Sequence, residues 1–222
     1  MRYNDKENGK EDPEQMKGLF ITFEGIDGSG KSTQIEKLSC DLQNAGISYV
    51  LIREPGGTAI GEKIRTILLD KANDRMHART ELLLYEAARA QIVEERIRPE
   101  LEAGKVVICD RFFDSTVAYQ GYARGLDLDA IRYLNNWSTA NLAPDITFLF
   151  DLDEETAYRR RHGRDGEEDR LEAEGLSFMK KVRDGYLALS KEEKRIKVVS
   201  ALDTPDVIYE KIRNAVWEVL GR

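Results

Sequence analysis

The sequence predicts an α/β fold in which a parallel sheet of five strands is covered by helices on both faces. Short apolar runs alternate with longer segments of helical periodicity, which is the pattern of strand–helix–strand units. Each run is apolar along most of its length, as expected for a strand buried on both faces. The five runs are residues 19–23, 49–52, 106–109, 146–150 and 196–199.

The helices after the first two runs are indicated by periodicity and by their end residues. Apolar side chains recur at helical spacing from Ser32 to Ala45, and Gly46 is suited to end that helix. After the second run, Thr58 is suited to cap the next helix at its N-terminus. Both helices therefore follow directly from the strand before them.

The longest helical pattern in the middle of the chain covers residues 79–96, and we expect Leu83, Leu84, Ala87 and Ala88 to form its buried side. Pro99 and Gly104 bound a shorter helical piece before the third run. The other helices are expected at about residues 114–122, 127–138, 154–162, 171–193 and 205–220.

Composition limits the kind of protein. The chain has 222 residues with no internal repeat or linker, so we expect residues 18–222 to form one domain and the charged residues 1–17 to be a disordered tail. The net charge of −7 argues against a nucleic-acid-binding surface. Two cysteines without metal spacing, no membrane-length apolar run and no signal-peptide core predict a cytoplasmic protein without a membrane partner.

A glycine-rich loop follows the first run. Its pattern, Gly-x4-Gly-Lys-Ser, is that of a P-loop, in which backbone N–H groups and a helix N-terminus surround phosphate oxygens. Lys31 would place its charge at the β- and γ-phosphates of a nucleoside triphosphate, and the Ser32 hydroxyl would ligate Mg²⁺. The expected triphosphate site comprises Gly25, Ile26, Asp27, Gly28, Ser29, Gly30, Lys31, Ser32 and Thr33.

Charged residues follow the ends of four runs. The carboxyl ends of parallel strands meet at one edge of a sheet, where ligands bind in such folds. This clustering is a second sign of a site, independent of the P-loop. The residues are Asp27, Arg53, Glu54, Asp110, Arg111, Asp151 and Asp153.

Three classes of P-loop protein compete. A GTPase would need an Asn-Lys-x-Asp motif, and a transporter-type ATPase would need Leu-Ser-Gly-Gly-Gln; the sequence contains neither. A small-molecule kinase needs a second pocket and a closing lid, for which the chain offers candidates.

Four stretches, in order, resemble a known family. They are residues 23–33, Arg-Glu-Pro-Gly-Gly-Thr at 53–58, Tyr-Glu-Ala-Ala-Arg at 85–89, and Asp-Arg-Phe to Ala-Tyr-Gln-Gly at 110–121. Over about residues 18–220 the chain is similar to the thymidylate kinases, which are P-loop nucleoside monophosphate kinases. The resemblance implies a three-layer α/β/α P-loop kinase fold with a helical lid, and a homodimer. It also implies transfer of a phosphoryl group from ATP, with Mg²⁺, to dTMP, giving dTDP for dTTP synthesis.

The resemblance implies that three residues bind the phosphate and the sugar of the acceptor. Asp27 would hold the sugar 3′-hydroxyl. Arg53 and Arg111 would grip the phosphate of dTMP, which a planar guanidinium contacts bidentately.

The resemblance assigns the base to a second group of residues. Tyr85 would stack on thymine, and Arg89, one helical turn later, would reach the base oxygen at C4. Thr116 would meet the base N3, and Tyr119 would crowd the 2′ position and so favour deoxyribose. Ser115, in the same motif, is expected in the acceptor site.

The expected lid covers about residues 159–172 and is rich in arginine. Gly28-Ser29 stands where some relatives carry an arginine, so the resemblance implies that the lid supplies the cation for the transferring phosphoryl group. The first candidates are Arg160 and Arg164, with Arg170 next.

An acceptor phosphate is already anionic, so the reaction needs no general base, which agrees with the presence of only two histidines. Asp110 would either reach Mg²⁺ or orient an arginine. Two alternatives stay open. A deoxynucleoside kinase would need a carboxylate base for a neutral 5′-hydroxyl, and a non-catalytic nucleotide-binding regulator would bind nucleotide without turnover.

Overall fold

The computed structural model describes residues 18–162 and 169–221. Its sheet is parallel throughout, with the strand order β2-β3-β1-β4-β5. All five predicted strands are confirmed, each within two residues of its expected ends. The strands are β1 (Leu19–Glu24), β2 (Tyr49–Arg53), β3 (Val106–Asp110), β4 (Ile146–Asp151) and β5 (Ile196–Ser200).

Helices connect the strands. They are α1 (Lys31–Asn44), α2 (Ala59–Leu69), α3 (Ala78–Ile92), α4 (Arg98–Glu102), α5 (Phe113–Thr116), α6 (Leu128–Ser138), α7 (Glu154–His162), α8 (Leu176–Glu192) and α9 (Pro205–Val219). Two π-helical segments, η2 (Val93–Ile97) and η3 (Val117–Ala123), extend α3 and α5, and two short 3₁₀ turns are η1 (Lys71–Asn73) and η4 (Glu172–Glu174). Thr58 caps α2 as expected, its hydroxyl accepting from Gly61 N–H at 2.9 Å.

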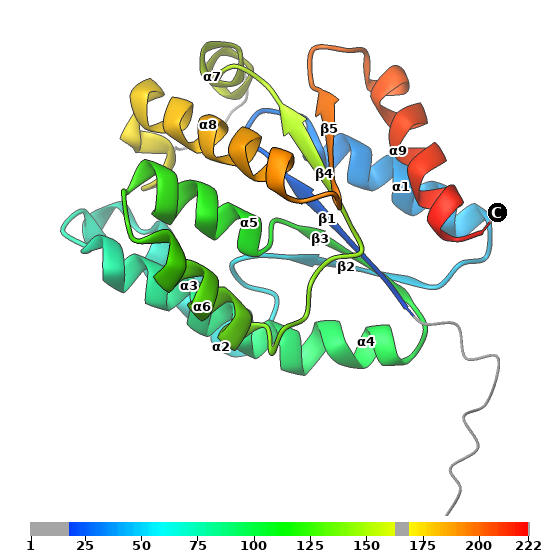
Figure 1. The fold of residues 1–222 in the computed structure, drawn as a ribbon, viewed down its shortest axis with the longest axis horizontal. Helices are drawn as coiled ribbons and strands as arrows, with labels where there is room; N and C mark the ends of the chain where they lie inside the picture. The colour runs from blue at the N-terminus through cyan, green and yellow to red at the C-terminus, as the bar shows by residue number, and fades with distance from the viewer. Residues whose placement is uncertain (1–17, 163–168, 222) are drawn as a thin grey trace, which may run out of the picture.

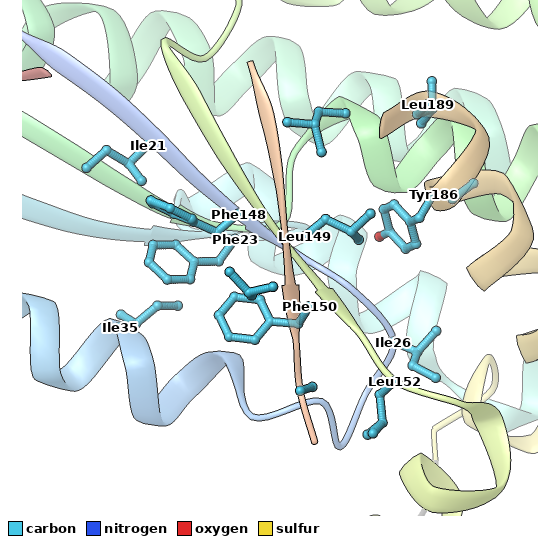
Figure 2. Packing of buried hydrophobic residues seen from close by; sticks show 14 of the residues in the cluster. Ile21, Phe23, Ile26, Ile35, Phe148, Leu149, Phe150, Leu152, Tyr186 and Leu189 are labelled. Atoms are coloured by element: carbon cyan, nitrogen blue, oxygen red, sulfur yellow. The ribbon is translucent and has the colours of Figure 1, made fainter. Parts of the chain in front are cut away.

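The helices cover both faces of the sheet and give the three-layer arrangement that the sequence predicts. In Figure 1, α1 and α9 lie on one side, and α3, α5 and α8 lie on the other. Figure 2 shows Phe23 and Phe150 on the face covered by α1, and their rings stack with centroids 5.8 Å apart. Leu149 points to the opposite face, toward Tyr186 of α8. No helix in the described part of the chain is long and apolar enough to cross a membrane.

The buried side of α3 agrees with the expected one only in part, because Ala88 is buried as expected but two of the other residues are not. Leu83 is 55% exposed and Ala87 is also exposed, whereas the polar Glu86 and Arg89 are buried. Apolar periodicity misplaced part of this face because α3 turns polar side chains inward. That inward polarity is itself a sign of a binding site.

The helix expected from residue 171 begins at Leu176 instead. Gly175, with φ 85°, separates α8 from η4. That left-handed conformation is comfortable for glycine and interrupts the helical hydrogen bonding. The expected tail at residues 1–17 and the central residues 163–168 of the expected lid lie outside the described residues.

Candidate active site

The P-loop connects β1 to α1, and its path requires glycine. Gly28 has φ 88°, and a Cβ there would lie 2.6 Å from the carbonyl oxygen of Ala157. Only a residue without a side chain fits both conditions. Gly30 precedes the first residue of α1, while Ser32 and Thr33 lie exposed in its first turn.

Lys31 is held inside the P-loop. Its ammonium donates to the carbonyl of Gly25 at 2.9 Å and lies 3.8 Å from Oδ1 of Asp27. Burial and the charge of Arg111 lower the pKa of Lys31. The buried hydroxyl of Ser29 has no hydrogen-bond partner among the described residues. These groups are placed where an anionic ligand would satisfy them.

A pocket of about 250 Å³ opens beside the P-loop. It lies at the carboxyl ends of β2 and β3, between α2, α3 and the segment after β3. Every residue that the sequence predicts for the acceptor lines it: Asp27, Arg53, Tyr85, Arg89, Arg111, Ser115, Thr116 and Tyr119. The structure therefore brings together residues that are up to 92 positions apart, from Asp27 to Tyr119.

Several polar atoms in this pocket lack partners. Thr116 Oγ1, Tyr119 Oη, Asp110 Oδ1 and Glu54 Oε1 are buried without a hydrogen bond among the described residues. Buried polar groups are nearly always paired in folded proteins, because leaving one unpaired costs about 1–3 kcal/mol. Four such atoms around one pocket indicate that a polar ligand completes their hydrogen bonds.

Arg111 follows β3 directly and points across the pocket to the P-loop. Its Nη2 donates to Asp27 Oδ1 at 2.7 Å, and its guanidinium carbon lies 5.3 Å from the ring centroid of Tyr119. The surrounding protein raises the pKa of Asp27, but the charges of Arg111 and Lys31 outweigh this and hold that pKa well below its usual range. Asp27 is therefore an anion beside two cations.

Arg89 lies at the closed end of the pocket, with only 1% of its surface exposed. Its Nε donates to Glu54 at 2.9 Å, and its Nη1 donates to Glu86 at 2.9 Å and to Asn135 at 3.0 Å. Among the described residues, Nη2 has no hydrogen-bond partner, which leaves its two N–H groups for a ligand. Burial raises the pKa of Glu54 to about 7, against the opposing charge of Arg89.

Arg53 lies at the mouth of the pocket. Its Nη2 is 3.0 Å from both carboxylate oxygens of Glu62, and its Nη1 donates to the carbonyl of Pro55. Both side chains of this ion pair are nearly half exposed. An exposed pair of this kind is worth about 1 kcal/mol or less, so an incoming phosphate can replace Glu62 at little cost.

Three residues were missed by sequence reasoning. Arg65 on α2 and Gln120 on η3 line the pocket. Glu24, which lies in the stretch 23–33 and has no predicted role, is fully buried at the end of β1. For Glu24 the signal was a charged residue ending an apolar strand. For Arg65 it was the position two helical turns after the Thr58 cap.

The predicted lid arginines lie in different places. Arg160 is exposed, donates to the carbonyl of Ala201 at 3.0 Å and does not line the pocket. Arg170 is buried, with Nη2 2.7 Å from Glu81 Oε2, so it anchors the end of the expected lid to α3. Arg164 lies outside the described residues. Arg161, which was not a first candidate, shares a small hollow with Asp27.

The described residues contain no group of three or more His, Cys, Asp or Glu side chains able to hold a metal. Asp110 offers a buried, unpaired carboxylate oxygen, and Ser32 offers a hydroxyl in the first turn of α1. Mg²⁺ is usually held by one or two protein oxygens together with phosphates and water. The residues present therefore fit Mg²⁺ bound with a nucleotide.

The model of the family described as thymidylate kinase matches residues 23–212 of the chain. The chain belongs to the thymidylate kinase family. It is 47% identical over 206 residues to the thymidylate kinase of Caldanaerobacter subterraneus subsp. tengcongensis, covering 92% of this chain and 98% of the relative. It is 49% identical over 203 residues to that of Halothermothrix orenii, covering 90% and 97%.

The fold agrees with a solved member of the family. The crystal structure of thymidylate kinase from Ehrlichia chaffeensis matches with a TM-score of 0.70 and 35% identity, covering 90% of this chain and 98% of that one. The resemblance seen in the four sequence stretches and the predicted fold class are thus both confirmed.

Proposed function

We propose that this chain transfers the γ-phosphoryl group of ATP to the phosphate of dTMP, giving dTDP for dTTP synthesis. The thymidylate kinase family supports this reaction and does not favour a deoxynucleoside kinase or a non-catalytic regulator. The observation that carries the proposal is the single pocket lined by all eight predicted acceptor residues. Asp27 belongs to both this pocket and the P-loop, so the acceptor site adjoins the donor site.

The pocket is suited to an anionic acceptor. Arg53, Arg65 and Arg111 line it and would neutralise the phosphate of dTMP. Tyr85 and the Nη2 group of Arg89 would face thymine, and Thr116 Oγ1, which is buried and unpaired among the described residues, would pair with the base N3. Catalysis is then positioning and charge neutralisation, and no general base is needed because the acceptor is already ionised.

The P-loop is suited to the donor. Lys31 would exchange the Gly25 carbonyl for the β- and γ-phosphate oxygens of ATP. Ser32 and Asp110 would hold Mg²⁺, which supplies positive charge at the donor phosphates when bound. Arg160 and Arg164 remain the candidates for the lid cation, and Arg161 joins them because it lies beside Asp27.

We also propose that two copies of the chain form a homodimer through α3 and α6. These helices pack against each other and expose Leu83, Tyr133 and Trp137, which are 55%, 65% and 75% exposed. The rings of Tyr133 and Trp137 stack with centroids 6.5 Å apart. Large exposed apolar side chains on adjacent helices are typical of protein–protein interfaces.

The free cysteines Cys40 and Cys109 support a reduced, cytoplasmic setting.

A panel of acceptors tests the proposed reaction. ATP-Mg is offered with dTMP, dUMP, dCMP, dAMP, dGMP and thymidine, and ADP release is measured. We expect the highest kcat/KM with dTMP and no turnover of thymidine. Turnover of thymidine in preference to dTMP would indicate a deoxynucleoside kinase, and no turnover of any acceptor would indicate a nucleotide-binding regulator.

A further inference from the structure

A buried carboxyl group that the proposed reaction does not use lies beside Arg111. Glu24 is fully buried, and one N–H and two hydroxyl groups lie within hydrogen-bond distance of its carboxylate. The N–H of Phe112 donates to its Oε1 at 2.7 Å, and the hydroxyl oxygens of Ser115 and Tyr186 lie 2.6 and 2.8 Å from its Oε2. Glu24 therefore holds both the backbone that follows Arg111 and two hydroxyl groups.

Tyr186 brings α8 into this group of residues. Figure 2 shows its side chain projecting from α8 toward the sheet, and it is 2% exposed. Its hydroxyl oxygen lies 3.2 Å from Nη1 of Arg111 and 2.7 Å from Oγ of Ser115. Ser115 Oγ in turn accepts from the same Nη1 at 3.3 Å. Nη1 of Arg111 is thus shared between two hydroxyl oxygens.

The number of hydroxyl protons on Ser115 and Tyr186 determines the direction of the hydrogen bonds among these residues. Each hydroxyl has one proton to donate and two lone pairs to accept with. When Glu24 is ionised, above its raised pKa of about 7, whichever of Ser115 and Tyr186 donates to the other, the chain of hydrogen bonds ends on the carboxylate of Glu24. The protons point toward Glu24, so lone pairs remain for Arg111, whose guanidinium can only donate.

These hydrogen bonds offset two unfavourable contributions to the free energy of the Arg111 conformation. Its φ is 70°, a left-handed conformation that is uncommon for a residue other than glycine. Its long side chain must also keep one orientation before the ligand arrives. Glu24 fixes the backbone through Phe112, Ser115 and Tyr186 hold Nη1, and Asp27 holds Nη2.

We propose that Glu24 and Tyr186 are positioning residues for the acceptor phosphate, acting through Arg111. The inference rests on the proposed function, in which Arg111 binds the phosphate of dTMP. Neither residue lines the acceptor pocket, so neither contacts the acceptor itself. Their hydrogen bonds hold the guanidinium of Arg111 in the orientation that receives the phosphate. Binding of dTMP therefore does not have to order this side chain, which reduces the entropy cost of binding.

Calorimetry with two ligands tests this role on the full chain. Tyr186→Phe keeps the ring in the core and removes only the hydroxyl. We expect about tenfold weaker binding of dTMP and unchanged binding of thymidine, which has no phosphate for Arg111. The KM for ATP should not change. Tyr209→Phe, a matched loss of a hydroxyl on α9, should leave both affinities as in the wild type.

A double-mutant cycle separates action through Arg111 from a general structural effect. In an Arg111→Ala background, Tyr186→Phe should cause no further loss of dTMP affinity, because the residue on which it acts is gone. Glu24→Gln provides a second variant. It should likewise weaken the binding of dTMP and leave the binding of thymidine unchanged. Melting curves confirm that each variant is folded.

The outcomes distinguish the inference from the proposed function. If the wild type phosphorylates dTMP but Tyr186→Phe weakens the binding of dTMP and of thymidine equally, the positioning role is overturned. Additive losses in the Arg111→Ala background would overturn it as well. If the wild type does not phosphorylate dTMP at all, the proposed function itself fails.

Discussion

Asp27 of the P-loop and Arg111 at the end of β3 form an ion pair, with 2.7 Å between Oδ1 and Nη2. The side chain of Asp27 is 40% exposed and that of Arg111 is 15% exposed, so the pair lies at the boundary of pocket and solvent. It joins the loop that would bind the donor to the arginine that would bind the acceptor. This ion pair therefore links the proposed donor site to the proposed acceptor site.

Replacing Asp27 by Asn tests this connection. Asn keeps the size of the side chain and removes the charge that holds Nη2 of Arg111. We expect kcat/KM for dTMP to fall about 100-fold, since a small misplacement of a binding group is enough for such a loss. Steady-state kinetics with varied dTMP measures it. A lower KM in Asp27→Asn would mean that Asp27 only competes with the phosphate for Arg111.

Lys31→Ala separates donor from acceptor. Within the described part of the chain, its hydrogen bonds and ion pair are with the P-loop residues Gly25, Ile26 and Asp27, so its removal should leave dTMP binding largely intact. We expect kcat to fall roughly 100- to 1,000-fold, as for loss of a group that stabilises transition-state charge. Lys37→Ala on the same helix removes a lysine paired with Asp206 and is the control. Near-normal turnover of Lys31→Ala would exclude its donor role.

The fold could be predicted almost completely because each strand is a short apolar run bounded by turn residues. The residues predicted for the acceptor share one pocket because charged residues and a recognisable motif follow those strands, and their binding of an acceptor stays a prediction. Arg65 and Glu24 received no predicted role, since their local signals, a helical position and a charged residue ending a strand, do not say which way the side chain turns. Their roles follow from long-range contacts, such as that between Glu24 and Tyr186, 162 positions apart.

The buried face of α3 shows the same limit. Apolar periodicity favoured Leu83 and Ala87, but the inward positions belong to Glu86 and Arg89. These polar residues are tolerated inside because they pair with each other and with Glu54. A sequence pattern records hydrophobicity, whereas burial here is decided by hydrogen-bonding partners from other elements.

Arg89→Ala should lower the stability of the fold and weaken the binding of dTMP. Removing the arginine leaves Glu54 and Glu86 buried without their cation. Breaking a buried ion pair in this way costs about 3–5 kcal/mol. We therefore expect a clear fall in melting temperature together with a large rise in KM for dTMP. Arg132→Ala, which breaks only exposed pairs, is the control. An unchanged KM would mean that Arg89 does not contact the base.

The proposed dimer predicts that Trp137→Glu gives a monomer. Trp137 is 75% exposed on α6, and a charge there would have to be buried in the interface. Sedimentation at several concentrations should show a dimer for the wild type and a monomer for the variant. Leu202→Glu changes an apolar residue that is 65% exposed elsewhere on the surface and should remain dimeric. A monomeric wild type would refute the proposed interface.

Stability should decrease as pH rises from about 4.5 to 7. Burial raises the pKa of both Glu24 and Glu54 to about 7 from an ordinary value of 4.5. In this window the folded protein keeps protons that the unfolded chain releases, so each glutamate favours unfolding as the pH rises. Each effect is on the order of 1–3 kcal/mol. Asp27, whose pKa is lowered, is ionised in both states and contributes no slope there.

Melting temperatures between pH 5 and 8 measure this slope. Glu54→Gln and Glu24→Gln should each flatten it, because glutamine cannot bind the proton that the folded state retains. Glu36→Gln, at an exposed position on α1, should leave the slope unchanged. An equal slope in all four proteins, including the wild type, would show that neither buried glutamate holds a proton near neutral pH.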